Sequence, residues 1–350
     1  MLLAQNYSES NSASQAFQAR GVGWYRKHFS LPSDWNDGAS EIWVFFEGSF
    51  HETTAWMNGE QLGPTHMQGY TSFALRIDNA TGLRFGPGEQ SENVLAVYID
   101  ASFGDGWWRE GGGLFRHYSL VRARRSSHLG VLGEGVFARP SNLTRSESES
   151  ESGWAGQVDA VLAVDTTLRN DEASPSSSSS SSSSTIVAQH RLLDSSGAEV
   201  VSFESSPGNA PAPGGSASKL SASVRIRGVS PWSVQAPALY TLETLVTVDG
   251  TVQDGTNTTI GFRTVDFTAD SGLLVNDRHV KLRGFCDHSN FGGLGSAVSD
   301  RVNLYRAQTL RRVGGNAWRM AHNPPIQARL EITDALGMVV MDENRDYGGH

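Results

Sequence analysis

Three groups of polar side chains carry residue types that can exchange protons or bind polar ligands. The groups lie in "RGFCDHSN" (Arg283, Asp287, His288), "WRMAHNPP" (Arg319, His322, Asn323) and "MDENRD" (Asp342, Glu343, Asn344). Histidine and carboxylate side chains can act as general acids and bases, and arginine can hold a carboxylate through two parallel hydrogen bonds. For any one group alone, a solvated loop or a helix cap is the favoured interpretation, as Asn323 before Pro324 illustrates, and the three groups together favour a site.

Each polar group follows a predicted strand. The strands are "HVKLRGF", "NAWRM" and "MVVM", and two predicted helices lie between them. The first helix starts at Ser299 or Asp300 and ends at Gly314-Gly315, with a periodic face of Val302, Tyr305, Arg306, Thr309, Leu310 and Val313. The second, "PPIQARLEITDALG", has Pro325 in its first turn and Gly337 past its end. This β-α-β-α-β order predicts a parallel sheet, and such sheets collect ligands at the carboxyl ends of their strands.

The rest of the chain predicts antiparallel β structure. Strand-like runs with frequent turns, including a hairpin signal at Asn58-Gly59, indicate a sandwich over about 15–128. A second sandwich, of immunoglobulin-like type, is expected at 129–265. We expect disorder at 1–14 and in Ser-rich insertions at about 145–153, 174–184 and 206–218, because serine tracts bury little apolar surface. Residues 266–350 then form the α/β part.

Composition excludes several functions. The formal net charge of -9 disfavours nucleic-acid binding, which needs a basic surface. The single cysteine, Cys286, rules out an internal disulfide and is expected to be a small buried residue. We find no transmembrane run, no convincing signal peptide and no metal-ligand or cofactor motif, so we predict no membrane partner, metal or cofactor. The sequence does not indicate a cellular compartment.

Several motifs together resemble glycoside hydrolase family 2. They are "GVGWYRKHFSLP", "AWMNGEQLG", "GWWREGGGLFRHYSL", "PALYTLETLV", "IGFRTVDF", "NAWRMAHNPP" and "GMVVMDEN", in the family's order. The resemblance implies a jelly-roll (galactose-binding-like) domain, an immunoglobulin-like domain and the first three strands of a TIM barrel. It implies retaining hydrolysis of β-glycosides, most like that of β-galactosidases, with a β-glycoside or oligosaccharide as the substrate.

The resemblance also implies roles for the polar groups. His322, Asn323 and His288 correspond to positions that line the sugar subsite, although a structural histidine is a close alternative for both rings. Asp342 is the expected acceptor for a sugar hydroxyl, with Glu343 and Asp287 in supporting roles. Arg283 and Arg319 are expected to hold carboxylates near the barrel floor. Asn344, Arg345 and Asp346 do not match the family's pattern after its Asp-Glu pair, so the sequence does not indicate which sugar is preferred.

The loop "GDGWWREGGGLFRH" provides a second set of candidates. The family sends a jelly-roll loop toward the barrel mouth here, so Trp108 is expected to stack on a sugar, and Asp105 or Glu110 to accept its hydroxyls. The alternative, slightly favoured, is that the tryptophans pack a joint between domains.

The two catalytic glutamates of the family follow later barrel strands. We therefore expect an N-terminal portion of a longer enzyme, with an incomplete barrel and no hydrolysis by this chain alone. A retaining mechanism needs two carboxyl groups about 5–5.5 Å apart, and adjacent strand residues such as Asp342 and Glu343 point to opposite sides. The alternative is a non-catalytic carbohydrate-binding protein that uses the jelly-roll domain. A homo-oligomer is compatible with the sequence, which does not indicate the oligomeric state.

Overall fold

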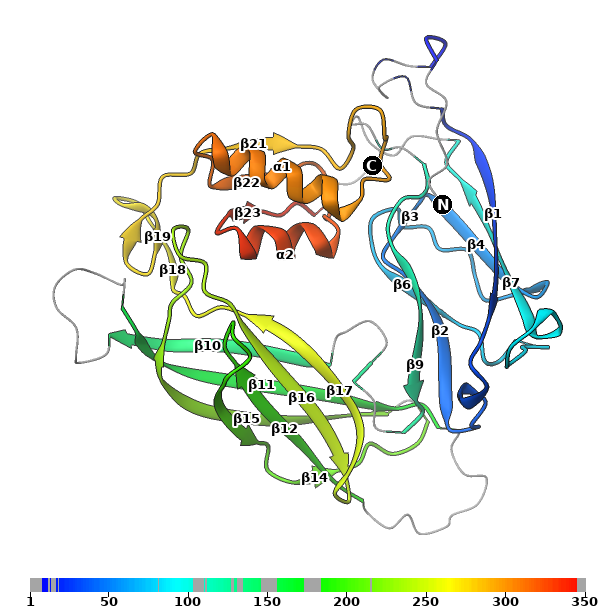
Figure 1. Ribbon diagram of the computed structural model, residues 1–350, viewed down its shortest axis with the longest axis horizontal. Helices are drawn as coiled ribbons and strands as arrows, with labels where there is room; N and C mark the ends of the chain where they lie inside the picture. The colour runs from blue at the N-terminus through cyan, green and yellow to red at the C-terminus, as the bar shows by residue number, and fades with distance from the viewer. Residues whose placement is uncertain are drawn as a thin grey trace. The chain divides into compact units, whose positions relative to one another are not determined.

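The computed structural model describes residues 8–11, 13, 17, 19–80, 82–102, 110, 112–126, 129–130, 135–145, 156–172, 184–214 and 216–344. The chain divides into two compact units. The first contains Met1–Arg122, Gly284–Thr333 and Val339–His350, and the second contains Ala123–Arg283 and Asp334–Met338. Antiparallel strands make up most of both units, and a short parallel β/α segment follows them in the chain (Figure 1).

The first unit contains a β-sandwich. One sheet has the order β1-β7-β4-β5, formed by β1 (Val22–Ser30), β7 (Glu92–Asp100), β4 (Glu52–Met57) and β5 (Glu60–Gln61). The other has the order β6-β2-β9, formed by β6 (Phe73–Arg76), β2 (Ser40–Phe46) and β9 (Tyr118–Arg124). A minor sheet pairs β3 (Ser49–Phe50) with β8 (Gly113–Leu114), and two 3-10 turns cover Ser33–Trp35 and Glu89–Ser91. The predicted sandwich is confirmed.

Alternation along the strands builds the sandwich core. In β7, Leu95, Val97 and Ile99 are buried, while the residues between them face outward. The hairpin predicted at Asn58-Gly59 is confirmed, because both residues have positive φ (50° and 91°) and Met57 pairs with Glu60. Two central residues in the left-handed region match a type I′ turn, whose twist fits that of the flanking strands.

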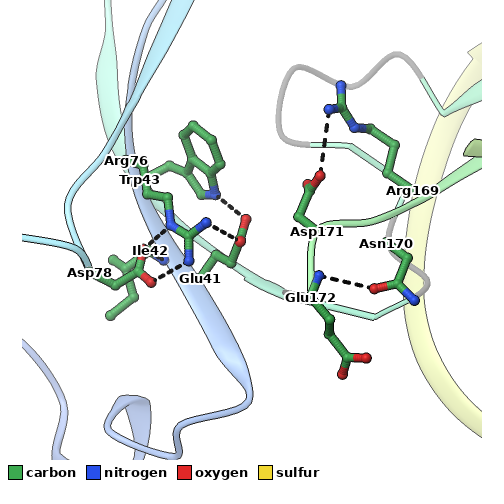
Figure 2. Close-up of polar contacts among 9 residues, drawn as sticks. All are labelled: Glu41, Ile42, Trp43, Arg76, Asp78, Arg169, Asn170, Asp171 and Glu172. Atoms are coloured by element: carbon green, nitrogen blue, oxygen red, sulfur yellow. Dashed lines mark hydrogen bonds and ion pairs between the residues drawn. The ribbon is translucent and has the colours of Figure 1, made fainter. Parts of the chain in front are cut away.

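A buried carboxylate in this sandwich has a structural explanation (Figure 2). Glu41 is fully buried on β2 and pairs with Arg76 on β6, with 2.5 Å between Oε1 and Nη1. Arg76 also donates to both oxygens of Asp78, at 2.9 and 2.8 Å, and Trp43 Nε1 donates to Glu41 at 3.2 Å. A buried charge is tolerated only when it is paired and hydrogen-bonded. This network therefore fastens β2 to β6.

The second unit contains the other sandwich. One sheet has the order β10-β11-β15, formed by β10 (Val136–Arg145), β11 (Val158–Asn170) and β15 (Ser216–Val229). The facing sheet contains β13 (Glu199–Glu204), β12 (Thr185–Leu193), β16 (Tyr240–Val248) and β17 (Thr251–Ile260), with β14 (Gly208–Asn209) beside β12. A small antiparallel sheet follows, with β18 (Val265–Thr268), β19 (Gly272–Val275) and β20 (Arg278–His279).

Polar contacts terminate β11 (Figure 2). The Asn170 side chain accepts from the backbone N–H of Glu172 at 3.0 Å. It also donates to the Pro211 carbonyl at 2.8 Å, so two backbone groups are satisfied where the strand ladder stops. The Arg169 and Asp171 side chains form an ion pair at 3.6 Å.

The expected insertions and boundaries differ from the structure in two places. The insertion expected at 206–218 contains β14, which pairs with Thr185 and Ile186, and the start of β15. Ladder pairing with long neighbours orders this polar segment, which composition alone could not indicate. The units also divide after Arg122 and Arg283, whereas we expected divisions after residues 128 and 265. Asn276, in the turn between β19 and β20, donates to the Trp232 carbonyl at 2.9 Å and so joins that sheet to the second unit. Most of 1–14, 145–153 and 174–184 lies outside the described residues.

The parallel β/α segment has the predicted order (Figure 1). It consists of β21 (Gly284–Asp287), α1 (Asp300–Arg312), β22 (Ala317–Met320), α2 (Gln327–Ala335) and β23 (Val339–Met341). The first strand begins later than "HVKLRGF" suggests, because Arg278 and His279 are paired in β20. Gly337 has a φ of +67°, a conformation that favours glycine after a helix.

The buried face of α1 agrees with the predicted one only in part. Asn303, Ala307 and Leu310 are buried, and Leu310 was predicted, whereas Tyr305 and Val313 are 54% and 73% exposed. The apolar periodicity did not indicate that a polar residue, Asn303, would be among the buried ones. Within the described residues, no helix is both long and apolar enough to cross a membrane.

Candidate functional site

The three polar groups gather at one edge of the parallel sheet. In the register, Asp287 lies beside Met320, and Arg319 lies beside both Cys286 and Met341. The strands run in the same direction, so the residues that follow them emerge at the same edge. These are Asp287-His288, His322-Asn323 and Asp342-Glu343-Asn344. The predicted sharing of one edge by strand ends is confirmed.

Glu343, Arg319 and His322 form a compact cluster at this edge. Arg319 donates from Nε to Glu343 Oε1, and its Nη2 lies 3.3 Å from His322 Nδ1. Glu343 Oε2 lies 3.1 Å from the same ring nitrogen. A residue of β22, a residue that follows β22 and a residue that follows β23 thus share one hydrogen-bonded group.

The environment of Glu343 keeps it ionised. Burial of the carboxyl opposes this, but hydrogen bonds from Arg319 and His322, with the charges of both partners, lower its pKa below the usual value of 4.5. The carboxyl side chain is 14% exposed. Glu343 is therefore an ionised acceptor near neutral pH and a poor source of a proton.

The two histidines of the edge lie together. The rings of His288 and His322 meet edge to face, with 5.1 Å between centroids. His322 and Asn323 are buried, and Asn323 Oδ1 accepts from the Ser289 hydroxyl at 3.0 Å. The ring pair and the serine–asparagine bond join the segment after β21 to the segment after β22.

Asp287 has a different set of partners. Its Oδ1 accepts from Arg306 Nη2 on α1, and its Oδ2 lies 3.8 Å from Arg329 Nη2 on α2. The Arg329 side chain is only 3% exposed and stacks over the Trp318 ring at 4.5 Å. Burial lowers the Arg329 pKa to about 10, and the positive charge of Arg306 adds to this while Asp287 opposes it. Asp287 thus connects the sheet to both helices.

Other predicted residues are placed differently. Asp342 is exposed, beside Glu343 but outside its hydrogen-bonded cluster. Arg283 is exposed and directly precedes β21, which begins at Gly284.

The candidates from the loop "GDGWWREGGGLFRH" also differ in their placement. Glu110 is buried, its carboxylate pairs with Arg20 at 2.9 Å, and its carbonyl accepts from Ser296 at 3.1 Å. These contacts give Glu110 a structural position that the sequence could not reveal, because Arg20 lies ninety residues away. Asp105 and Trp108 lie outside the described residues.

Sequence reasoning missed three participants. Arg306 and Arg329 were assigned to helices without a role at the site, and both contact Asp287. The low number of apolar side chains in these helices was the one sequence signal for a polar contact. Cys286, expected to be buried, is exposed, and its sulfur accepts from Arg319 Nη1 at 3.3 Å. Its strand is an edge of the three-stranded sheet, which explains the exposure. Across the described residues, no group of three or more histidine, cysteine or acidic side chains is arranged to hold a metal.

The chain thus contains two β-sandwiches, followed in sequence by parallel β/α units with polar strand ends. Residues 157–263 match the family "Glycosyl hydrolases family 2", and residues 267–349 match "Glycosyl hydrolases family 2, TIM barrel domain". Residues 3–105 match "Beta-galactosidase second all-beta domain". The chain belongs to glycoside hydrolase family 2.

Individual relatives support this assignment. A β-galactosidase of Bacteroides ovatus is 31% identical over 327 residues, covering 93% of this chain and 34% of the relative. A β-glucuronidase of Formosa agariphila is 26% identical over 358 residues, covering 95% and 33%. The crystal structure of a family 2 member from Bacteroides cellulosilyticus matches with a TM-score of 0.80 and 28% identity, covering 97% of this chain and 42% of that one. The chain thus spans about a third of the length of these curated relatives.

Proposed function

We propose that these 350 residues form the sandwich domains and the first three barrel strands of a longer retaining β-glycosidase, most like a β-galactosidase. The observation that carries the proposal is the cluster of Arg319, His322 and Glu343 at the carboxyl ends of parallel strands. This is the edge at which barrel enzymes bind their substrates. The similarity to a β-galactosidase supports the substrate class.

One residue of this edge would contact the sugar, and the others would position their neighbours. Asp342 is exposed and so is available to accept a sugar hydroxyl. Glu343 supports it by fixing Arg319 and the His322 ring. His288, against His322, and Asn323, bonded to Ser289, shape the wall of the subsite. Asp287 holds the helices behind that wall.

The chemistry of bond cleavage needs further groups. A retaining glycosidase uses one carboxyl group as acid/base and another as nucleophile on the same anomeric centre. Glu343 is committed to Arg319 and His322, and its lowered pKa makes it unsuited to donate a proton. Glu343 is therefore unsuited to form this pair with its neighbour Asp342. We therefore propose that this chain alone does not hydrolyse glycosides.

A pair of hydrolysis assays tests the proposal. Residues 1–350 and a polypeptide that continues the reading frame past His350 would be compared on nitrophenyl β-galactoside and nitrophenyl β-glucuronide. We expect turnover only by the longer polypeptide, and nuclear magnetic resonance should detect the β-anomer as the first product. Turnover by residues 1–350, or an α-anomer as the first product, would contradict the proposal.

The second candidate, a non-catalytic carbohydrate-binding protein, stays a prediction. Exposed apolar groups of the β/α segment count against it as a complete description. Phe285 on the edge strand β21 is 66% exposed, and it lines an open cavity of about 410 Å³ together with Tyr305 of α1 and Val313, which follows α1. Apolar surface of this kind is typical of an interface that further structure covers.

A further inference from the structure

An arginine between two sandwich strands reaches the β/α segment. Arg116 lies between β8 and β9, within the motif "GWWREGGGLFRHYSL". Its Nη2 donates to the carbonyl of Pro324, which lies between β22 and α2. The two residues belong to the same compact unit, although 208 positions separate them in the chain. A single side chain thus joins the sandwich to the turn that carries His322 and Asn323.

The guanidinium group of Arg116 is held firmly on the sandwich side. Its Nη1 donates to the carbonyls of Tyr70 and Glu47, at 2.7 and 3.3 Å. The guanidinium carbon lies 5.9 Å from the centre of the Tyr70 ring and 5.1 Å from that of Phe115. The aliphatic part passes Gly48, where an added Cβ would lie only 2.9 Å from Arg116 Cδ. Because a guanidinium group presents its N–H groups in a rigid fork, the bonds on the sandwich side determine where Nη2 points.

Stability alone does not explain a buried charge at this position. Burial lowers the pKa of Arg116 to about 10, and interactions with Tyr70 and Glu47 oppose this, so the side chain is still protonated at neutral pH. Removing a charge from water costs free energy, and well-packed apolar residues of similar volume are often at least as stabilising. The cost is consistent with a residue that specifies the position of a neighbouring segment.

The turn that Arg116 contacts is stiff and carries residues of the strand-end edge. Pro324 and Pro325 have fixed φ angles, and the residue before a proline is restricted as well. A bond to the Pro324 carbonyl therefore also constrains the two residues before it. Both are buried, and they are Asn323 and His322, whose Nδ1 lies 3.1 Å from the carboxylate of the edge cluster.

Other contacts dock the β/α segment on the sandwich without Arg116. Ser296 Oγ donates to the Glu110 carbonyl at 3.1 Å. Ala297 packs against a buried cluster of the sandwich that contains Phe50. Both contacts come from the connection between β21 and α1, and not from the turn after β22. Loss of the Arg116 guanidinium should therefore leave the docking in place and change the turn.

We propose that Arg116 is a positioning residue by which the sandwich sets the strand-end edge. Through the Pro324 carbonyl it fixes the orientation of the His322 ring and of Asn323. Arg116 does not contact the sugar, so the sandwich contributes to hydrolysis through the shape of the subsite wall. This consequence for hydrolysis rests on the proposed function, whereas the position of the His322 ring does not.

Nuclear magnetic resonance of this chain with 15N-labelled histidine tests the position of the ring. Arg116→Lys keeps the charge, but an ammonium group cannot bond to several carbonyls in the geometry of the fork. We expect it to move the ring signals of His322, which the His322→Gln variant assigns. Arg122→Lys is the matched control and should leave these signals in place, because Arg122 bonds to Ser40 and Asp37 within the sandwich. Arg116→Gln is measured in the same way if Arg116→Lys does not fold.

Assays of the longer polypeptide on nitrophenyl β-galactoside test the consequence. We expect Arg116→Lys to lower kcat/KM at least tenfold, because small displacements of positioned groups have large effects on rate. Urea unfolding separates this from a merely structural role, since a less stable variant keeps the kcat of its folded fraction. Arg122→Lys should keep the wild-type kcat/KM. So should Phe267→Ala, an exposed position on β18 of the other unit.

Three results would overturn the proposal. The first is a set of His322 signals that stays in place in the Arg116 variants, and the second is an equal change in Arg122→Lys. The third is an unchanged kcat/KM of Arg116→Lys in a longer polypeptide that is active. Absence of turnover by the wild-type longer polypeptide, with His322 signals that move only in the Arg116 variants, would contradict the proposed function and support the positioning role.

Discussion

Asp287 in the three-stranded sheet and Glu343 just after it contact arginines that differ in burial, although Asp287 itself is the more exposed carboxylate (30% against 14%). Asp287 faces the helices and is held by Arg306 and the buried Arg329. Glu343 lies at the strand-end edge and is held by Arg319, whose side chain is 42% exposed. The residue types are the same, an acid with arginine, but the first pair links secondary structures and the second borders the candidate substrate site. Burial of the arginine, and not the identity of the pair, distinguishes structure from function here.

The largest expected effect is loss of the Asp287 pairs. Asp287→Asn removes the charge that balances two guanidinium groups, of which that of Arg329 is buried, and we expect it to destabilise the fold by about 2 kcal/mol, typical of hydrogen bonds to a charged group. Urea unfolding followed by tryptophan fluorescence, with Trp318 beside Arg329 as a local reporter, measures this. Asp342→Asn, in an exposed position, is the control and should change stability by less than about 0.5 kcal/mol. Equal changes in unfolding free energy for Asp287→Asn and Asp342→Asn would contradict a structural role of the Asp287 pairs.

Glu343→Gln should cost less and should depend on pH. We expect about 1 kcal/mol near pH 7, typical of a partly exposed charged hydrogen bond. The folded-state pKa of Glu343 is lowered, so its contribution is complete above the unfolded-state value of 4.5 and is lost as the pH falls through the folded-state pKa. Unfolding titrations of the wild type and the variant at several pH values measure the difference. A difference that grows on acidification would contradict this description.

The smallest effect concerns salt. Ions screen exposed pairs more than buried ones, so 1 M sodium chloride should reduce the contribution of Glu343 by a few tenths of a kcal/mol and leave that of Asp287 nearly unchanged. Each contribution is the difference in unfolding free energy between the wild type and Glu343→Gln or Asp287→Asn at low and high salt. Stronger screening of Asp287 would mean that Arg329 is open to solvent.

The sequence predicted the order of elements well because local rules specify them. Asn58-Gly59 gave the correct hairpin, and Gly314 and Gly337 marked the helix ends, since these residues fix backbone conformation wherever they occur. The convergence of the three strand ends followed from the β/α order. The β structure within 206–218 was missed because pairing to β12 and β11 depends on distant strands.

Partners of individual side chains could not be predicted in the same way. Nothing in the local sequence indicates that Glu110 pairs with Arg20, or that Arg306 turns from the helix face to Asp287. The burial of Asn303 and the exposure of Tyr305 on α1 likewise depend on the tertiary neighbours of the helix. The resemblance to the family indicated where to look for the candidate site. The structure was needed to show that Glu343 is hydrogen-bonded to Arg319 and His322, whereas Asp342 is exposed.

The most direct test of the strand-end site is the kcat/KM of the longer polypeptide for nitrophenyl β-galactoside. The wild type would be compared with Asp342→Asn and Glu343→Gln, with Phe267→Ala as a control. If the edge binds the sugar, both substitutions should lower kcat/KM at least tenfold, Asp342→Asn through a direct contact and Glu343→Gln through the position of Arg319 and His322. Values within twofold of the wild type for both variants would contradict the account.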